Sequence, residues 1–270
     1  MRLNLARLSL AVSLLIPVYF MAAALGVKFG LWPWQFGLGV LIAKFALPVL
    51  GIGLALALIA LIACLVRAPR RGWAIALAAL LIPALGVGYL ATVRARGAAI
   101  PPIHDIATNV VDPPIHSARV LADRQAQGAN PVNALSAKMS TLKPYQAPQF
   151  AALGPRTLGE VGQAAYPAVK TLAVSATPAA TYDAAQAQAR AEGWTLAAGA
   201  PNSGVIEATA ETFWFGFKDD VAVRIRRAPD GEGSLVDVRS TSRVGLSDLG
   251  ANAARIEAYL AGMSKRLAKG

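Results

Sequence analysis

Residues 216–256 decide the fold of this chain, and they read GFKDDVAVRIRRAPDGEGSLVDVRSTSRVGLSDLGANAARI. Two segments, 221–226 and 235–240, alternate apolar and polar residues, and the turn-forming stretch 228–233, rich in Pro, Gly and Asp, separates them. Period-two spacing around such a turn predicts a β-hairpin. A helix is expected directly after it.

The register of this hairpin follows if its turn is centred on 230–231. The expected pairs are Ile225 with Val236 and Val223 with Val238 on the buried face, and Arg224 with Asp237 on the other. A preceding hairpin centred on 217–218 would place Glu211 opposite Arg224. Charges of alternating sign on one face are typical of a solvated sheet surface, here formed by Glu207, Glu211, Arg224, Arg226, Asp237 and Arg239.

Further elements are expected on both sides of the hairpin. Strands are predicted at 168–175, 194–197 and 205–213, and Thr177 and Pro178 predict the start of a helix that ends before Gly193. The final helix, capped by Ser247 or Asp248, carries an apolar stripe of Leu249, Ala253, Ile256, Leu260, Met263 and Leu267. This order, β-α-β4-α, predicts an α+β domain of the helix-grip or TATA-binding-protein-like type, in which an antiparallel sheet packs on the long C-terminal helix.

The N-terminal third predicts a membrane region. Segments 9–27, 45–66 and 73–93 are uncharged and about 20 residues long, which is the length a helix needs to cross a bilayer. We therefore expect three transmembrane helices in residues 1–96, a Pro-rich linker and lead-in arm in residues 97–166, and a globular α+β domain in residues 167–270. The apolar first segment with Ala22–Ala24 also fits a cleaved signal peptide.

Charge is divided unevenly between these parts. Residues 1–96 hold nine basic residues and no acidic one, whereas residues 97–270 hold 17 basic and 15 acidic residues. The excess therefore belongs to membrane flanks, and nucleic-acid binding is not expected. Basic residues before the first span and between the second and third place the N-terminus in the cytoplasm and the C-terminal domain in the periplasm; they are Arg2, Arg7, Arg67, Arg70 and Arg71.

The residue composition argues against several classes of functional site. The three apolar segments contain no acid, His or Asn, so a transporter or channel is not expected. Cys64, the single cysteine, excludes disulfides within the chain. The repeat Pro-Pro-Ile-His puts His104 beside Asp105 and His116 near Asp112; this could begin a metal site, but a turn or edge strand on the domain is favoured, and no metal is expected.

Several motifs, in a fixed order, resemble a known family. They are Asp105–Thr108, Asp112–Pro114, Tyr166–Pro167, Ile206–Thr209, Gly216–Val221, Val236–Ser240, Ser242–Gly245 and Ser247–Ile256. Together they resemble the bacterial domain of unknown function (DUF) 1499 over about residues 100–265. The resemblance implies an envelope protein, lipid-anchored or fused to membrane spans, and supplies no established reaction.

The polar residues in these motifs form a candidate polar junction: Asp219, Asp220, Arg239, Arg243, Asp248, Asn252 and Arg255. In a catalytic interpretation, Asp219 or Asp220 is a general base and Arg243 and Arg255 bind an anion. In the favoured structural interpretation, the aspartates close a turn and cap a helix, and the arginines bond carbonyls and carboxylates.

The function expected is therefore that of a multi-pass protein of the bacterial inner membrane with a non-catalytic interaction or scaffold domain. The alternative is an envelope protein that binds a lipid or small apolar ligand in a helix-grip cavity, and a hydrolase-like enzyme comes third. The expected partners are the lipid bilayer and another membrane or envelope protein, with a bound lipid under the alternative. No cofactor is expected.

Overall fold

The computed structural model describes residues 2–66, 68–197 and 204–268, so the predicted topology residue Arg67 lies outside the described part. The chain divides into two compact units. One comprises residues 1–96 with 212–216, and the other comprises residues 97–211 with 217–270.

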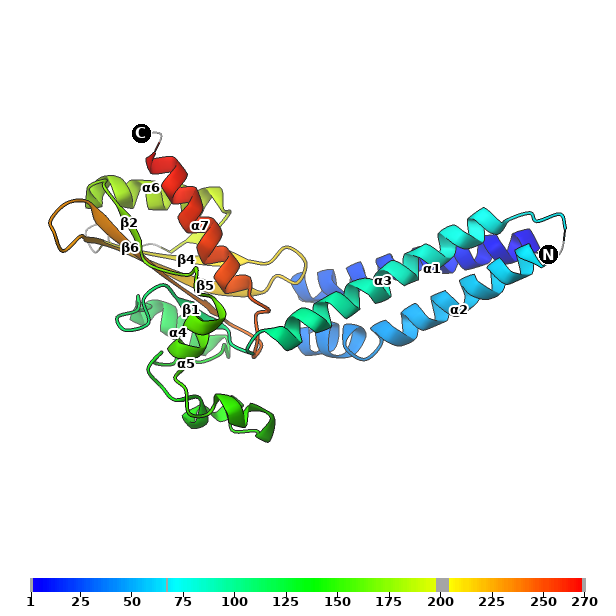
Figure 1. Cartoon of the computed structure of the whole chain (residues 1–270), viewed down its shortest axis with the longest axis horizontal. Coiled ribbons are helices and arrows are strands. Elements are labelled where there is room, and N and C mark those ends of the chain that lie inside the picture. The colour runs from blue at the N-terminus through cyan, green and yellow to red at the C-terminus, as the bar shows by residue number, and fades with distance from the viewer. Residues whose placement is uncertain (1, 67, 198–203, 269–270) are drawn as a thin grey trace. The chain divides into compact units, whose positions relative to one another are not determined.

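The first unit contains three helical segments that are long and apolar enough to cross a membrane. They are α1 (Arg2–Lys28), a π-helical stretch (Gln35–Ile42) continuing into α2 (Ala46–Leu65), and α3 (Trp73–Ala99) (Figure 1). The expectation of three such helices is confirmed. The second segment begins ten residues before the uncharged run predicted from sequence, because a helix tolerates the intervening Lys44 that the charge criterion rejected.

Of the glycines Gly51, Gly53, Gly86 and Gly88 in α2 and α3, two lie at close contacts. A Cβ on Gly53 would overlap the Ile16 side chain, and a Cβ on Gly86 would overlap that of Leu50. Nothing lies within 4 Å of the corresponding positions on Gly51 and Gly88. Small residues therefore permit close packing at Gly53 and Gly86, as they commonly do between membrane helices.

The second unit is built on a six-stranded antiparallel sheet. Its strands are β1 (Asp105–Ala107), β2 (Leu172–Val174), β3 (Thr195–Leu196), β4 (Val205–Glu211), β5 (Lys218–Arg227) and β6 (Ser234–Ser242). The order is β1-β6-β5-β4-β3, and β2 pairs with the other end of β6 from β1. From β2 onward the predicted β-α-β4-α order is confirmed, whereas β1 was not predicted.

Helices and turns complete this unit. They are α4 (Ala118–Ala126), three 3₁₀ turns (Met139–Thr141, Lys143–Tyr145, Pro148–Leu153), α5 (Leu158–Ala165), α6 (Pro178–Ala191) and α7 (Ala251–Leu267). Side-chain caps begin several of them: the hydroxyls of Ser117 and Thr177 accept N–H bonds at the starts of α4 and α6, and Thr157 forms a capping box with Glu160.

The β5–β6 register is as predicted, with Val223 opposite Val238 and Ile225 opposite Val236. The predicted β4–β5 register is wrong, because Glu211 pairs with Lys218 and not with Arg224. β5 begins at Lys218, so the turn is the short loop 212–217. The shift is six residues, an even number, so each side chain keeps its predicted face.

The two faces of the sheet are covered differently. Helices α6 and α7 cover one face, while α4 lies on the other (Figure 1). Against α7 the sheet presents valines of β5 and β6, and Trp194 stacks on Tyr259 with ring centroids 4.7 Å apart. The Tyr259 hydroxyl donates to the Ala185 carbonyl at 2.9 Å. Side chains thus occupy the space that a helix-grip ligand would need.

The polar face is only in part the solvated surface that the sequence indicated. Asp237 is 0% exposed and Arg239 is 4% exposed. Residues of the arm lie over this face: Thr108 and Asp112 bond to Asp237 and Arg224, and Arg124 reaches Asp220. Asp237 and Arg239 therefore belong to an internal layer of polar side chains, whereas Glu211 is exposed and the other charged residues of this face are partly exposed.

Candidate functional site

The seven residues of the polar junction lie around one end of the sheet, where β5 begins, β6 ends and α7 starts. Because neighbouring residues of a strand point to opposite faces, Asp219 and Asp220 point to different sides. The junction is therefore two clusters separated by the sheet.

The cluster on the α7 side is centred on Asn252, which is fully buried. Its amide donates to the His104 carbonyl at 3.0 Å and to the Ser242 hydroxyl at 2.8 Å, and its oxygen accepts from Ser240 and Arg255. Arg255 also pairs with Asp219 at 2.5 Å. These bonds join α7 to β5, β6 and the segment before β1.

The cluster on the arm side is centred on Asp220, which is 2% exposed. Arg243 binds both carboxylate oxygens, with Nε at 2.9 Å and Nη2 at 2.7 Å, and Arg124 binds one of them at 2.5 Å. The Thr209 hydroxyl donates at 3.1 Å. A carboxylate with two guanidinium groups is a strongly paired, charge-assisted arrangement.

A second ion pair lies beside Asp220 on the same face. Arg239 binds Asp105 through two bonds of 2.9 and 2.7 Å and donates to the Asn133 carbonyl. The Thr241 hydroxyl donates to Asp105 at 2.9 Å. The sequence analysis placed Asp105 in a family motif and considered it beside His104 for a metal site, and it missed Arg124, since nothing local marks either residue as an ion-pair partner.

Electrostatics keep the buried carboxylates of Asp220 and Asp237 charged. Burial alone would raise the pKa of Asp220, but hydrogen bonds from Arg243 and Arg124 outweigh it and hold the pKa below its usual value. The same balance lowers the pKa of Asp237, where burial is opposed by Thr171, Arg224 and Arg226. Both groups act as fixed negative charges within the domain.

Asp248 differs from the other aspartates. Burial raises its pKa, and the nearby charge of Asp219 adds to the effect. Its oxygens accept from the backbone N–H groups of Gly250 and Asn252 at 2.9 and 2.8 Å. Gly250 occupies the N-cap position of α7, so Asp248 caps the helix from two residues earlier. The predicted N-cap, Ser247 or Asp248, is therefore wrong by two or three residues, although Asp248 still accepts an N–H group of the first turn of α7.

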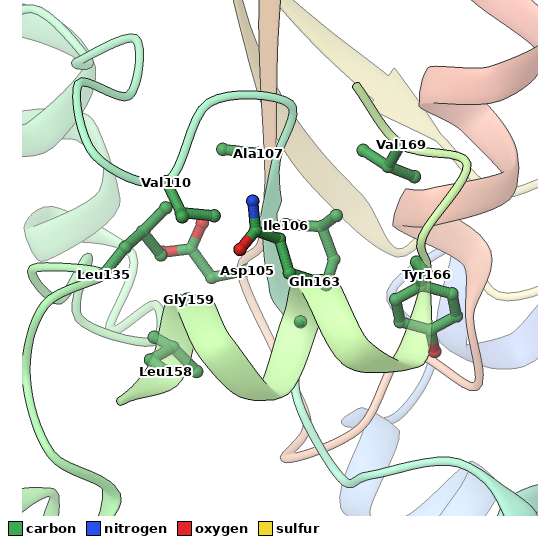
Figure 2. A pocket seen from close by; sticks show the side chains of 11 residues that line it. Asp105, Ile106, Ala107, Val110, Leu135, Leu158, Gly159, Gln163, Tyr166 and Val169 are labelled. Carbon is green, nitrogen blue, oxygen red and sulfur yellow. The ribbon is translucent and has the colours of Figure 1, made fainter. Parts of the chain in front are cut away.

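A small enclosed cavity lies between α5 and β1 (Figure 2). Its volume is about 10 Å³, enough for one water molecule. Gly159 and Gly162 of α5 face it, and a Cβ on Gly159 would lie 3.0 Å from that of Val110. The close approach of α5 to the arm leaves no room for a substrate at this point.

His104 and His116 have different hydrogen-bond partners and do not form a metal site together. His104 Nδ1 lies 3.3 Å from the Leu246 carbonyl, and His116 Nε2 lies 3.4 Å from the Thr241 hydroxyl. Within residues 2–66, 68–197 and 204–268, His, Cys, Asp and Glu side chains form no group of three that could hold a metal ion. Asp105, the predicted companion of His104, is bound to Arg239 instead.

All seven junction residues have hydrogen-bond or ion-pair partners inside the fold. Such an arrangement fixes the relative positions of the sheet, α7 and the arm. A general base would need a carboxylate that can reach a substrate proton, whereas the carboxylates of Asp219 and Asp220 face arginines. The geometry supports the structural interpretation of these residues.

Comparison with protein families identifies the family of this chain. The model of a family described as "Protein of unknown function (DUF1499)" matches residues 105–263. No curated protein matches the chain significantly. The matched range begins at the first residue of β1 and ends within α7, so it contains both clusters of the junction.

Proposed function

This chain belongs to the DUF1499 family, and from that premise we propose that it is a multi-pass protein of the bacterial inner membrane whose C-terminal unit is a non-catalytic interaction or scaffold domain in the periplasm. The membrane part of this proposal rests on three helices of sufficient length and apolarity. The orientation rests on basic residues that flank them, since Arg2, Arg7, Arg70 and Arg71 would face the cytoplasm.

The observation that carries the scaffold role is the buried ion network of the junction, in which each of the seven junction residues has a partner and, among the surrounding residues, Arg124 Nε makes no hydrogen bond. Asp220 is shared by two arginines, and Asn252 makes four hydrogen bonds with its side chain. Such networks rigidify and specify a fold when every member is paired. A rigid domain tied to a membrane suits the presentation of a surface to another envelope protein.

The exposed part of the arm is the surface we propose for that contact. Val111 is 94% exposed and Ile115 is 76% exposed, and both belong to the segment that covers the polar sheet face. Exposed apolar side chains of this size are typical of interaction sites when they occur together.

Topology is tested by reporter fusions in a bacterial host. A phosphatase that is active only outside the cytoplasm, fused after residue 268, should be active, and the same reporter fused after Arg71 should be inactive. Equal activity of the two fusions, or the reverse pattern, would contradict the proposed orientation.

The scaffold role is tested by a photo-crosslinking amino acid at position 111 or 115 in cells. A discrete adduct with one envelope protein is expected, and Val111→Asp should remove the adduct formed from position 115. Glu257 on the exposed side of α7 is the matched control position. Adducts that are identical from positions 115 and 257 would argue against a specific contact at the arm.

Under the alternative function, a lipid or small apolar ligand would bind at a different place from the helix-grip cavity that the sequence analysis expected. Side chains fill the space between the sheet and α7, but an open hollow of about 620 Å³ lies beside α5 and is lined in part by Ile100, Phe150 and Leu153. Native mass spectrometry of the detergent-extracted protein separates the two proposals. A retained lipid that Phe150→Asp releases would favour the binder.

A further inference from the structure

The loop between β4 and β5, residues 212–217, reads TFWFGF and is termed the aromatic tip. Phe213 is 71% exposed and Trp214 is 48% exposed, and their rings meet edge to face at 5.2 Å. Turns are usually built from small polar residues. The other long hairpin of the sheet follows that rule, since its turn, 228–233, reads APDGEG and is termed the acidic tip.

The two tips lie at opposite ends of β5. The aromatic tip adjoins the pair Glu211–Lys218, and the acidic tip adjoins the pair Arg227–Ser234. A ten-residue strand separates the tips by roughly 30 Å. The sheet therefore has one aromatic end and one acidic end.

The chain from α3 enters the sheet at the aromatic end. β1 begins at Asp105, which pairs with Thr241 near the end of β6, and Thr241 in turn pairs with Asp220 near the start of β5. Only five residues separate Ala99 from Asp105, so they span at most about 20 Å. We call this end of the sheet the tether end.

Contacts within the domain hold the incoming chain in place at the tether end. The Asp248 N–H donates to the Ile103 carbonyl at 3.3 Å, and a Cβ on Gly97 would lie 3.4 Å from Leu249 Cδ2. Leu249 itself is 54% exposed and has a φ of 54°, a conformation uncommon for a leucine. The tether end thus carries a third exposed apolar side chain.

We propose that Phe213 and Trp214 bind the headgroup interface of the lipid bilayer that α1–α3 cross. Aromatic side chains favour the level of the lipid headgroups, where an apolar ring and a polar neighbour are both accommodated. A short tether to a span keeps them within reach of that level. This inference rests on the membrane-spanning part of the proposed function and is independent of the scaffold role.

The test uses the full-length chain with Cys64→Ala, reconstituted in nanodiscs of phosphatidylcholine and phosphatidylglycerol. An environment-sensitive dye is attached at Lys218→Cys, beside the aromatic tip, or at Asp230→Cys, in the acidic tip. Lipids that carry a nitroxide near the headgroup should quench the dye at 218 several-fold more than the dye at 230. Phe213→Ser with Trp214→Ser should reduce quenching at 218 to the level at 230.

A dye at Leu58→Cys in α2 reports on the span itself. Quenching at 58 without quenching at 218 would overturn this inference and leave the membrane-spanning proposal intact, whereas no quenching at 58 would overturn both. Quenching at 218 that survives the serine pair would show that the aromatic tip is not the anchor. Hydrogen exchange of β5 and β6 confirms that the serine variant is folded. If the dye at position 218 were shielded from solvent in native membranes but not in the nanodiscs, a protein partner would be indicated. This result would also overturn the inference.

Discussion

Asp220 illustrates how a buried charge is retained in this domain. Its carboxylate accepts four hydrogen bonds from Arg124, Arg243 and Thr209, and these offset its removal from water. A buried ion pair is weak proof of stability, because desolvation opposes the attraction. Removal of one partner is costly all the same, since the remaining charges stay buried without a counter-ion.

Asp220→Asn should therefore destabilise the domain by about 3 kcal/mol, because Arg124 and Arg243 lose the charge between them. Hydrogen exchange of β5 and β6 amides in the full-length protein in detergent measures this loss. Asp230→Asn, in the exposed acidic tip, is the control and should change stability by less than about 0.5 kcal/mol. Equal effects of the two substitutions would show that the Asp220 pairs contribute nothing.

His116 predicts a pH dependence of stability near neutrality. It is 5% exposed, and burial, followed by the charge of Arg239, lowers its pKa. Asp105 and Asp220 oppose this shift, and Arg124 adds to it. Since the folded state favours the neutral ring, the contribution of His116 to stability is complete above the unfolded pKa of about 6.5 and is lost as the pH falls through the folded pKa.

Protection of β6 amides in the wild type should accordingly decrease as the pH is lowered from about 7 to 5, after correction for intrinsic exchange rates. His116→Asn should remove most of that slope, because asparagine does not titrate. His104→Asn provides a comparison at the other buried histidine. A slope that is unchanged in His116→Asn would assign the pH dependence to another group.

At the scale of elements, local signals determined how well the sequence predicted each one. The helix α6 was predicted almost to the residue because Thr177, Pro178 and Gly193 mark its ends. The β5–β6 hairpin was predicted because its turn residues fix the register. In contrast, the aromatic tip resembles strand sequence, since aromatic residues favour strands, and the β4–β5 register was therefore displaced.

Elements and contacts that depend on distant partners were not predictable in the same way. β1 has three residues, too few for a period, and its position is set by pairing with β6. The structure places the seven junction residues near one end of the sheet, and their division between its two faces depends on the register of the strands. The pairing of Arg124 with Asp220 could not be predicted from the sequence, because it depends on the position of α4 over Asp220.

The contact between α6 and α7 offers a test of packing between elements. A Cβ on Gly262 would overlap the side-chain amide of Gln188. Gly262→Ala should therefore destabilise the domain by about 1 kcal/mol or more through overpacking. In a Gln188→Ala background the same substitution should become neutral or stabilising by up to about 1 kcal/mol, because alanine favours the helix.

Thermal unfolding of the four proteins of this cycle measures the coupling between the two positions. Gly193→Ala is not a suitable control, because that glycine has a φ of 75°. Ala254→Gly, on the exposed side of α7, reports helix propensity without the contact. Additive effects at 188 and 262 would show that the two helices do not meet closely there.

At the scale of the whole molecule, charged residues of the arm form ion pairs with charged residues of the sheet. Arg124 and Asp105 belong to residues 97–166, and their partners, Asp220 and Arg239, belong to β5 and β6. The family match begins at Asp105, and the second compact unit begins at Gly97. The arm therefore supplies counter-ions to the sheet in addition to connecting it to α3.

These ion pairs between the arm and the sheet predict where the chain can be divided into fragments that fold. A fragment of residues 97–270 should fold cooperatively, whereas a fragment of residues 168–270 should not, because Arg239 and Asp220 would lose Asp105 and Arg124 and the polar sheet face would lose its cover. Circular dichroism and hydrogen exchange of the two purified fragments measure the difference. The double variant Asp105→Asn with Arg124→Met in the longer fragment removes the two counter-ions but leaves the arm covering the sheet. Loss of these charges alone is expected to destabilise the fragment only in part. Folding of residues 168–270 with the same unfolding midpoint as residues 97–270 would show that the arm is a linker and that the ion pairs across it are dispensable.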